Sequence, residues 1–141
     1  MPMQRFLAYT WAAPVSLFGL LLLLLARGLG AQVCVLDGVA ECSGGPIDKI
    51  SRLPFFSQFA AITLGHIIFA NDAACMQRLR VHERTHVKQY ERWGPLFPPL
   101  YLLSSAWALL RGKHYYRDNV FEIEAFAAQY ADEAAQAQKN A

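Results

Sequence analysis

The sequence predicts an α+β fold with an N-terminal transmembrane helix, and three observations support this prediction. The run Ala8–Ala26 carries no charge over 19 residues and contains six consecutive leucines. Two segments further on, residues 32–42 and 59–70, are rich in β-forming residues and contain turn signals. Two later stretches, residues 72–93 and the segment that begins at Asn119, have helical periodicity after a residue suited to capping a helix.

The composition limits both the size of the fold and its partners. A chain of 141 residues allows one modest domain, and 55% hydrophobic with 17% charged residues is more apolar than a typical soluble protein. The net charge is only +2, and the sequence has no dense basic patch and no glycine-rich phosphate loop. We therefore expect no nucleic-acid partner.

The apolar run Ala8–Ala26 is long enough to cross a bilayer as a helix. A cleaved signal peptide is the alternative, because Arg5 precedes the run and small residues follow it at 28–31. Its apolar core exceeds the roughly 7 to 15 residues usual in signal peptides, which favours a retained anchor. We expect an anchor of residues 1–30, a domain of residues 31–141 and a single-pass membrane protein. Basic residues on both sides of the run leave its orientation open.

Residues 32–42 predict a β-hairpin around Asp37-Gly38, a strong turn signal. The length of the turn decides whether two cysteines can form a disulfide. A three-residue loop places Cys34 opposite Cys42 and allows a disulfide, whereas a two-residue loop pairs Cys34 with Glu41 and excludes it. The sequence leaves both loop lengths possible.

A short connection follows over residues 47–58, helical in part and broken by Pro54. Residues 59–70 then predict a β-strand region that ends at Asn71-Asp72. His66 lies in this region, and a single histidine in a strand is more often an ordinary core or surface residue than a ligand.

The helix predicted from Asp72 to Gly94-Pro95 carries the pattern His-Glu-x-x-His at residues 82–86. Four residues apart on a helix, His82 and His86 share one face and can hold one metal ion. Glu83 then lies beside the metal, where it can accept a proton from a water that the metal has acidified. Two ordinary interface histidines are the alternative explanation of this spacing.

A third ligand is expected from the helix that follows Asn119, which contains Glu122 and Glu124. Two residues apart on a helix the two side chains point in different directions, so at most one of them should bind the metal. If Asn119 is the N-cap, Glu122 occupies the third helical position and could instead return to the cap amide as in a capping box.

These motifs resemble those of the gluzincin zinc peptidases over roughly residues 60–130. In that family a Glu-x-x-Ala-Asp setting follows the His-Glu-x-x-His helix, and Glu122 to Ala125 match it, whereas Phe126 replaces the Asp. Matching the Ala places the ligand at Glu122, with Glu124 as the reserve ligand if the helix is rotated. The resemblance implies a small bacterial zincin-like domain with one zinc ion held by His82, His86 and Glu122, and with Glu83 as general base. It further implies a strand directly before the motif helix, to whose edge an extended substrate adds.

The segment between the two helices is poor in charge from Gly94 to Gly112. Its prolines leave about eleven good helical residues, too few to cross a bilayer, so residues 96–110 predict either a buried helix or one that lies in the membrane interface. The polar link after it supplies candidate donors for the oxyanion that peptide hydrolysis develops: His114, Tyr115, Tyr116 and Arg117.

Taken with the resemblance, the sequence predicts a zinc metallopeptidase that hydrolyses peptide or protein substrates at the membrane, the bacterial inner membrane being expected. The alternative from another class is a non-catalytic zinc-binding accessory or scaffold protein of the membrane that keeps the same helix pair.

Overall fold

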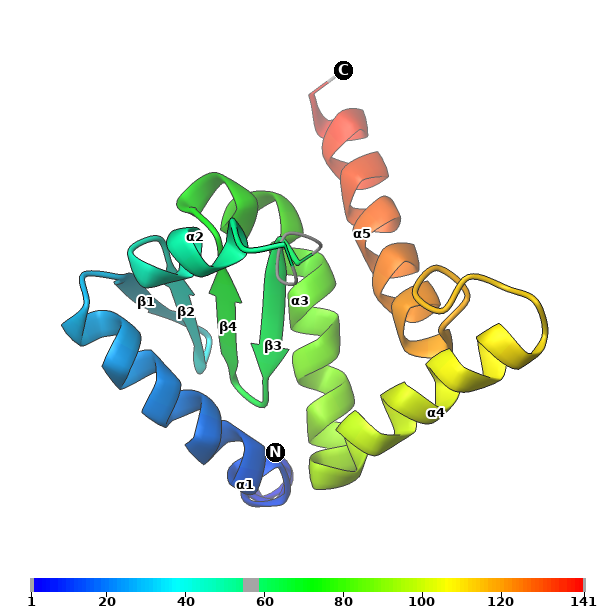
Figure 1. Ribbon diagram of the computed structural model, residues 1–141, viewed down its shortest axis with the longest axis horizontal. Helices are drawn as coiled ribbons and strands as arrows, with labels where there is room; N and C mark the ends of the chain where they lie inside the picture. The colour runs from blue at the N-terminus through cyan, green and yellow to red at the C-terminus, as the bar shows by residue number, and fades with distance from the viewer. Residues whose placement is uncertain (1, 55–58, 141) are drawn as a thin grey trace.

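The computed structural model describes residues 2–54 and 59–140, and it is an α+β fold (Figure 1). The predicted connection at 47–58 therefore falls partly outside the described residues. In chain order the elements are α1 (Pro2–Gly28), β1 (Gln32–Leu36), β2 (Val39–Ser43), α2 (Pro46–Ser51), β3 (Ala61–Leu64), β4 (Ile67–Ala70), α3 (Ala73–Trp93), the 3₁₀ turn η1 (Gly94–Leu96), α4 (Phe97–Leu110) and α5 (Val120–Lys139).

The predicted first hairpin is confirmed as β1 and β2, joined by a two-residue turn. Leu36 pairs with Val39, and both turn residues have positive φ, 51° at Asp37 and 82° at Gly38. These angles belong to the tight turn that matches strand twist and that Asp-Gly favours. The register places Cys34 opposite Glu41, which excludes the cross-strand disulfide, and the three cysteines are free thiols in the described structure.

The four strands form one sheet in the order β1-β2-β4-β3. Residues 59–70 form two antiparallel strands, because the chain reverses at Gly65, where φ is 64°. The strand directly before the motif helix, β4, runs parallel to β2 and lies inside the sheet. The expectation that the strand directly before the motif helix offers an edge is therefore wrong for β4; the sheet edges are β1 and β3, and β3 lies within the predicted region 59–70.

The sheet lies between α1 on one face and α3 on the other. Along β4 the side chains alternate, so that Ile67 and Phe69 join a core with α1 while Ile68 and Ala70 join a core with α3. All four are buried, which explains why this strand is continuously apolar instead of alternating.

Helix α1 packs closely along the sheet. A side chain at Gly19 would place its Cβ 2.8 Å from the carbonyl oxygen of Leu64, so the approach requires a glycine. Leu23 and Ala26 are buried in the core that includes Phe69. Ala12 and Gly19 are buried as well, whereas the leucines at 20, 21, 24 and 25 are exposed, and Phe6–Gly28 is long and apolar enough to span a membrane.

Helix α3 has the predicted ends. Asp72 caps it by accepting a hydrogen bond from the amide of Cys75, and Gly94 ends it with a φ of 55°. Arg80 ties it to the sheet with paired hydrogen bonds of 2.8–3.1 Å to the buried carboxylate of Glu41.

Helix α4 falls within the predicted helix at 96–110 and has 14 residues, so the prolines do not shorten it to about eleven. Pro98 and Pro99 fall in its first turn, where a missing amide hydrogen removes no intrahelical bond, so the helix begins before them. Figure 1 shows α4 leading away from the end of α3, and α5 returning beside α3.

Candidate metal centre

The first turn of α5 faces the middle of α3, and one residue fixes this arrangement. Asn119 is fully buried and caps α5 by accepting a hydrogen bond from the amide of Phe121, the possibility that the sequence leaves open. Its side-chain nitrogen donates to the carbonyl of Tyr101 at 3.0 Å and to the hydroxyl of Ser105 at 2.8 Å, both on α4. The start of α5 is thereby held against α4, and Glu122 is directed at α3.

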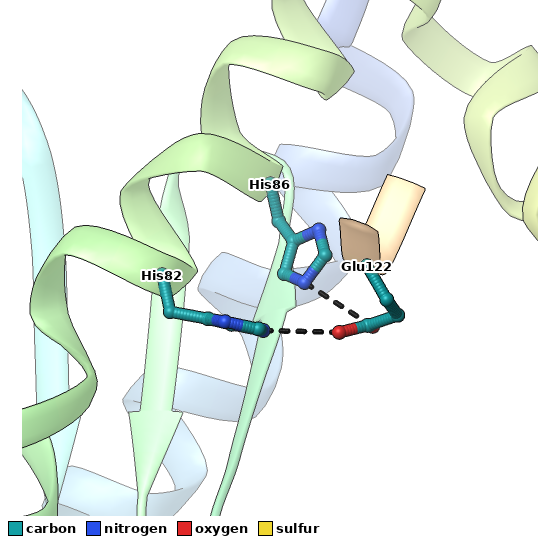
Figure 2. Close-up of side chains that lie close together, drawn as sticks. All are labelled: His82, His86 and Glu122. Carbon is teal, nitrogen blue, oxygen red and sulfur yellow. Dashed lines mark ion pairs between the residues drawn. The ribbon is translucent and has the colours of Figure 1, made fainter. Parts of the chain in front are cut away.

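His82, His86 and Glu122 point toward one another from these two helices (Figure 2). His82 Nε2 lies 3.1 Å from Glu122 Oε2, and His86 Nε2 lies 3.4 Å from Glu122 Oε1. The three side chains are buried, and their ligand atoms lie within 4.8 Å of one another. Glu122 thus faces the histidines, while the Asn119 amide donates to the carbonyl of Tyr116 and does not form a capping box. The group could bind a metal ion.

The hydrogen bonding of the Glu122 carboxylate indicates whether a cation fits this group. Glu122 Oε2 is buried and, within the described residues, has no hydrogen-bond partner, although His82 Nε2 is only 3.1 Å away. The two atoms therefore approach each other without hydrogen-bond alignment, as ligands do when both are directed at a third atom. A buried carboxylate oxygen without a partner is costly, and a metal ion would satisfy it.

The hydrogen bonds of Gln89 set the tautomer of His86. The amide nitrogen of Gln89 donates to the carbonyl of Phe121 at 3.0 Å and to Glu124 Oε2 at 2.8 Å, and both are acceptors. Its oxygen must therefore face His86 Nδ1, 2.8 Å away, which makes Nδ1 the donor. In the neutral ring the lone pair then lies on Nε2 and points at Glu122. This orientation of a histidine by its outer nitrogen is typical of metal ligands.

The charges of the group are coupled. Burial would raise the pKa of Glu122, but the two imidazoles in contact with its carboxylate and the Tyr101 phenol lower that pKa well below its usual range. Burial lowers the pKa of His86, but Glu122 outweighs this effect and raises it overall. A proton on His86 and a metal ion therefore compete for the same position beside Glu122.

Glu83 lies next to the group and is 5% exposed. Burial raises the pKa of its carboxyl group, against the opposing effects of His86 and of Thr63. Thr63, on the edge strand β3, donates a hydrogen bond of 2.7 Å to Glu83 Oε2. The sheet edge thus positions this carboxylate.

Two tyrosines complete the surroundings of Glu122. Tyr101 Oη donates to Glu122 Oε1 at 2.6 Å, and burial together with this contact strongly raises the pKa of the Tyr101 phenol. Tyr116, one of the predicted candidates, also interacts with Glu122, and burial raises its pKa in the same way. Sequence reasoning missed Tyr101. The available signal was its position in an apolar helix, together with Ser104 and Ser105 on the same face.

The other candidates lie elsewhere. His114 organises the loop before α5, where its Nδ1 accepts hydrogen bonds from the amides of Tyr116 and Arg117. Tyr115 stacks on His114, and Arg117 is exposed. The reserve ligand Glu124 bonds to Gln89 and lies 3.7 Å from Arg92, outside the group.

His66 also lies away from the group. Its ring stacks on Tyr9 of α1 at 4.0 Å, and its two nitrogens lie 3.1 Å from Ser16 Oγ and 3.2 Å from Glu91 Oε1. His66 therefore belongs to the contact between α1, the second hairpin and α3.

The replacement of the expected Asp by Phe126 has a structural counterpart. The Phe126 ring packs against the edge of His82 with centroids 4.7 Å apart. His82 Nδ1 is buried, and none of the described residues forms a hydrogen bond with it. The two histidines are thus held differently, His86 by a hydrogen bond and His82 by packing.

Comparison with protein-family models, with curated proteins and with solved structures finds no match to this chain. The gluzincin resemblance stays a prediction from the residues, and the geometry of the site carries the functional argument.

Proposed function

We propose that this protein is a zinc metallopeptidase. The observation that carries the proposal is the buried convergence of two imidazole nitrogens and one carboxylate, with the second buried carboxylate of Glu83 beside them. Two nitrogens and one oxygen from three side chains are the donor set of catalytic zinc sites, which leave a further position open. The zinc in such sites acidifies water and polarises the substrate carbonyl.

The chain's own residues would divide the remaining work. Glu83 accepts a proton from the attacking water, and its raised pKa makes it a stronger base than an exposed glutamate. Thr63 holds the Glu83 carboxylate in place from β3. Tyr101 fixes one oxygen of Glu122, and Tyr116, which also interacts with Glu122, is the predicted oxyanion donor that would act in this group.

The proposed location is a membrane, with α1 as a retained anchor. Its uncharged length supports the membrane location. The burial of Leu23 and Ala26 in the domain core supports retention of the helix, because a signal peptide is removed from the mature protein. The peptide or protein substrate would then meet the site close to the membrane.

The test compares full-length wild type with Glu83→Gln, and uses Glu133→Gln on the exposed face of α5 as matched control. We expect about one zinc per chain in all three by elemental analysis. Cleavage of a fluorogenic peptide library should be lost only in Glu83→Gln, by about 10²- to 10⁴-fold.

A second function, a zinc-binding accessory protein of the membrane, is supported by the packing of Phe126 where the family has its Asp. It becomes the better explanation if zinc-loaded wild type cleaves nothing, or if Glu83→Gln cleaves as well as wild type.

A further inference from the structure

Helix α4 has an inverted distribution of polarity. Its polar groups face inward, where Tyr101 bonds to Glu122, Ser104 Oγ accepts from the amide of Val120 and Ser105 Oγ accepts from Asn119. Its outward side chains are apolar and between 58% and 81% exposed: Leu102, Leu103, Trp107, Leu109 and Leu110. A helix on the surface of a water-soluble protein has the opposite arrangement.

The charge pattern around α4 points to lipid as the medium that covers this outer face. No charged residue occurs from Gly94 to Leu110, whereas Arg92 and Arg111 bound the segment. The guanidinium of Arg111 lies 5.8 Å from the centre of the Trp107 ring, and Lys113 follows it on the surface. Tryptophan with arginine and lysine at the end of an apolar segment is typical of the boundary between acyl chains and headgroups.

Helix α1 contacts the chain where α4 begins. Trp11 of α1 packs against Gly94, and Ala12 joins a core with Tyr90 and with Phe97, the first residue of α4. Figure 1 shows the two helices diverging from this corner on the outside of the fold. Both carry exposed leucines along their outer sides.

We propose that the outer face of α4 is embedded in the lipid interface of the bilayer that holds α1. With 14 residues α4 is about 21 Å long, which is less than the roughly 30 Å thickness of the hydrocarbon core. The helix is therefore too short to cross the core and lies in the interface. The inner face of the same helix touches Glu122 through Tyr101. On the proposed function, which this step requires, the substrate is a peptide segment at the membrane surface.

The test measures the environment of single labels in the full-length chain in vesicles of phosphatidylethanolamine and phosphatidylglycerol. Leu103→Cys and Leu110→Cys are placed in a background with Cys34→Ser, Cys42→Ala and Cys75→Ser, and labelled with an environment-sensitive fluorophore. Ala137→Cys, exposed on α5, is the matched control. We expect blue-shifted emission and about twofold or greater quenching by spin-labelled lipid at 103 and 110, with neither effect at 137.

Two results would overturn the proposal. Water-like emission at both α4 positions would show that the face is not in lipid. Apolar emission that lipid quenchers do not reduce, and that disappears on dilution of the protein in the vesicles, would show that a second copy covers it.

A second measurement without cysteine substitutions controls for misfolding of the cysteine variants. In the variant Trp11→Phe/Trp93→Phe, Trp107 is the remaining tryptophan, and brominated lipid should quench it. Neither measurement depends on zinc or cleavage, so the membrane contact and the peptidase can fail separately.

Discussion

Gln89 should control the metal affinity of the centre although it is not a ligand. It is 1% exposed and connects His86 to the start of α5 through three hydrogen bonds. Gln89→Leu keeps a similar volume but frees the His86 ring to turn and to adopt the other tautomer. Loss of such an outer partner weakens metal binding by about 10- to 100-fold, equivalent to about 1.4–2.7 kcal/mol.

The same change should lower the stability of the metal-free protein. The carbonyl of Phe121 and the carboxylate of Glu124 both lose a donor, but Glu124 is partly exposed and can bind water. The buried Nδ1–H of His86 also loses its acceptor and dominates, because the Phe121 carbonyl is only partly buried, and we expect a loss of about 1–3 kcal/mol in the free energy of unfolding. Gln138→Leu, on the exposed end of α5, should change neither quantity.

Zinc affinity is measured by competition with a chromophoric chelator at fixed pH, and stability by denaturant unfolding. Gln89→Glu separates hydrogen bonding from packing, because it keeps an acceptor for His86 Nδ1 and loses both donors. We expect its zinc affinity to lie between those of wild type and Gln89→Leu. Equal affinities for wild type and Gln89→Leu would refute the argument that this side chain sets the tautomer.

Three further predictions concern the base, the carboxylate ligand and the anchor. The fold raises the pKa of Glu83, so the protonated carboxyl contributes to stability below its unfolded pKa, and this contribution is lost as pH rises through the folded pKa. The melting temperature of metal-free Glu83→Gln should therefore exceed that of wild type at neutral pH and approach it in acid. Tyr101→Phe should weaken zinc binding about tenfold in chelator competition, whereas the exposed Tyr130→Phe should not; equal losses would mean that the contact with Glu122 is unimportant. Leu23→Ala should cost about 2–5 kcal/mol in denaturant unfolding in detergent, and Leu24→Ala, 60% exposed, close to nothing; a stable, cooperatively folded fragment of residues 31–141 would contradict the role of α1 in the core.

Local signals in the sequence predicted the parts of the fold that depend on neighbouring residues. The caps at Asp72 and Asn119 and the turn at Asp37-Gly38 each use side-chain or backbone preferences within a few positions. The spacing of His82 and His86 likewise predicts that they share a helix face, since helix geometry alone decides this.

Features that depend on distant segments could not be predicted in this way. The interior position of β4 follows from its parallel pairing with β2, more than twenty residues earlier in the chain. The contact of Tyr101 with Glu122 requires α4 and α5 to meet, which Asn119 arranges. The run Ala8–Ala26 predicts a membrane span by length and composition, but neither property reveals that Gly19 packs against β3.

The unequal support of the two histidines bears on how the metal affinity is divided between them. His86 is oriented by Gln89, whose own donors are fixed to α5, so its Nε2 is directed at Glu122 whether that nitrogen carries a proton or binds a metal. His82 is restrained by the edge contact with Phe126, which limits the position of the ring but leaves open which nitrogen carries the proton. A ring that must select its tautomer on binding gives up part of its interaction energy. His86 and Glu122 are therefore already oriented for a metal ion, whereas on the proposed function the orientation of His82 would be completed only when the metal binds.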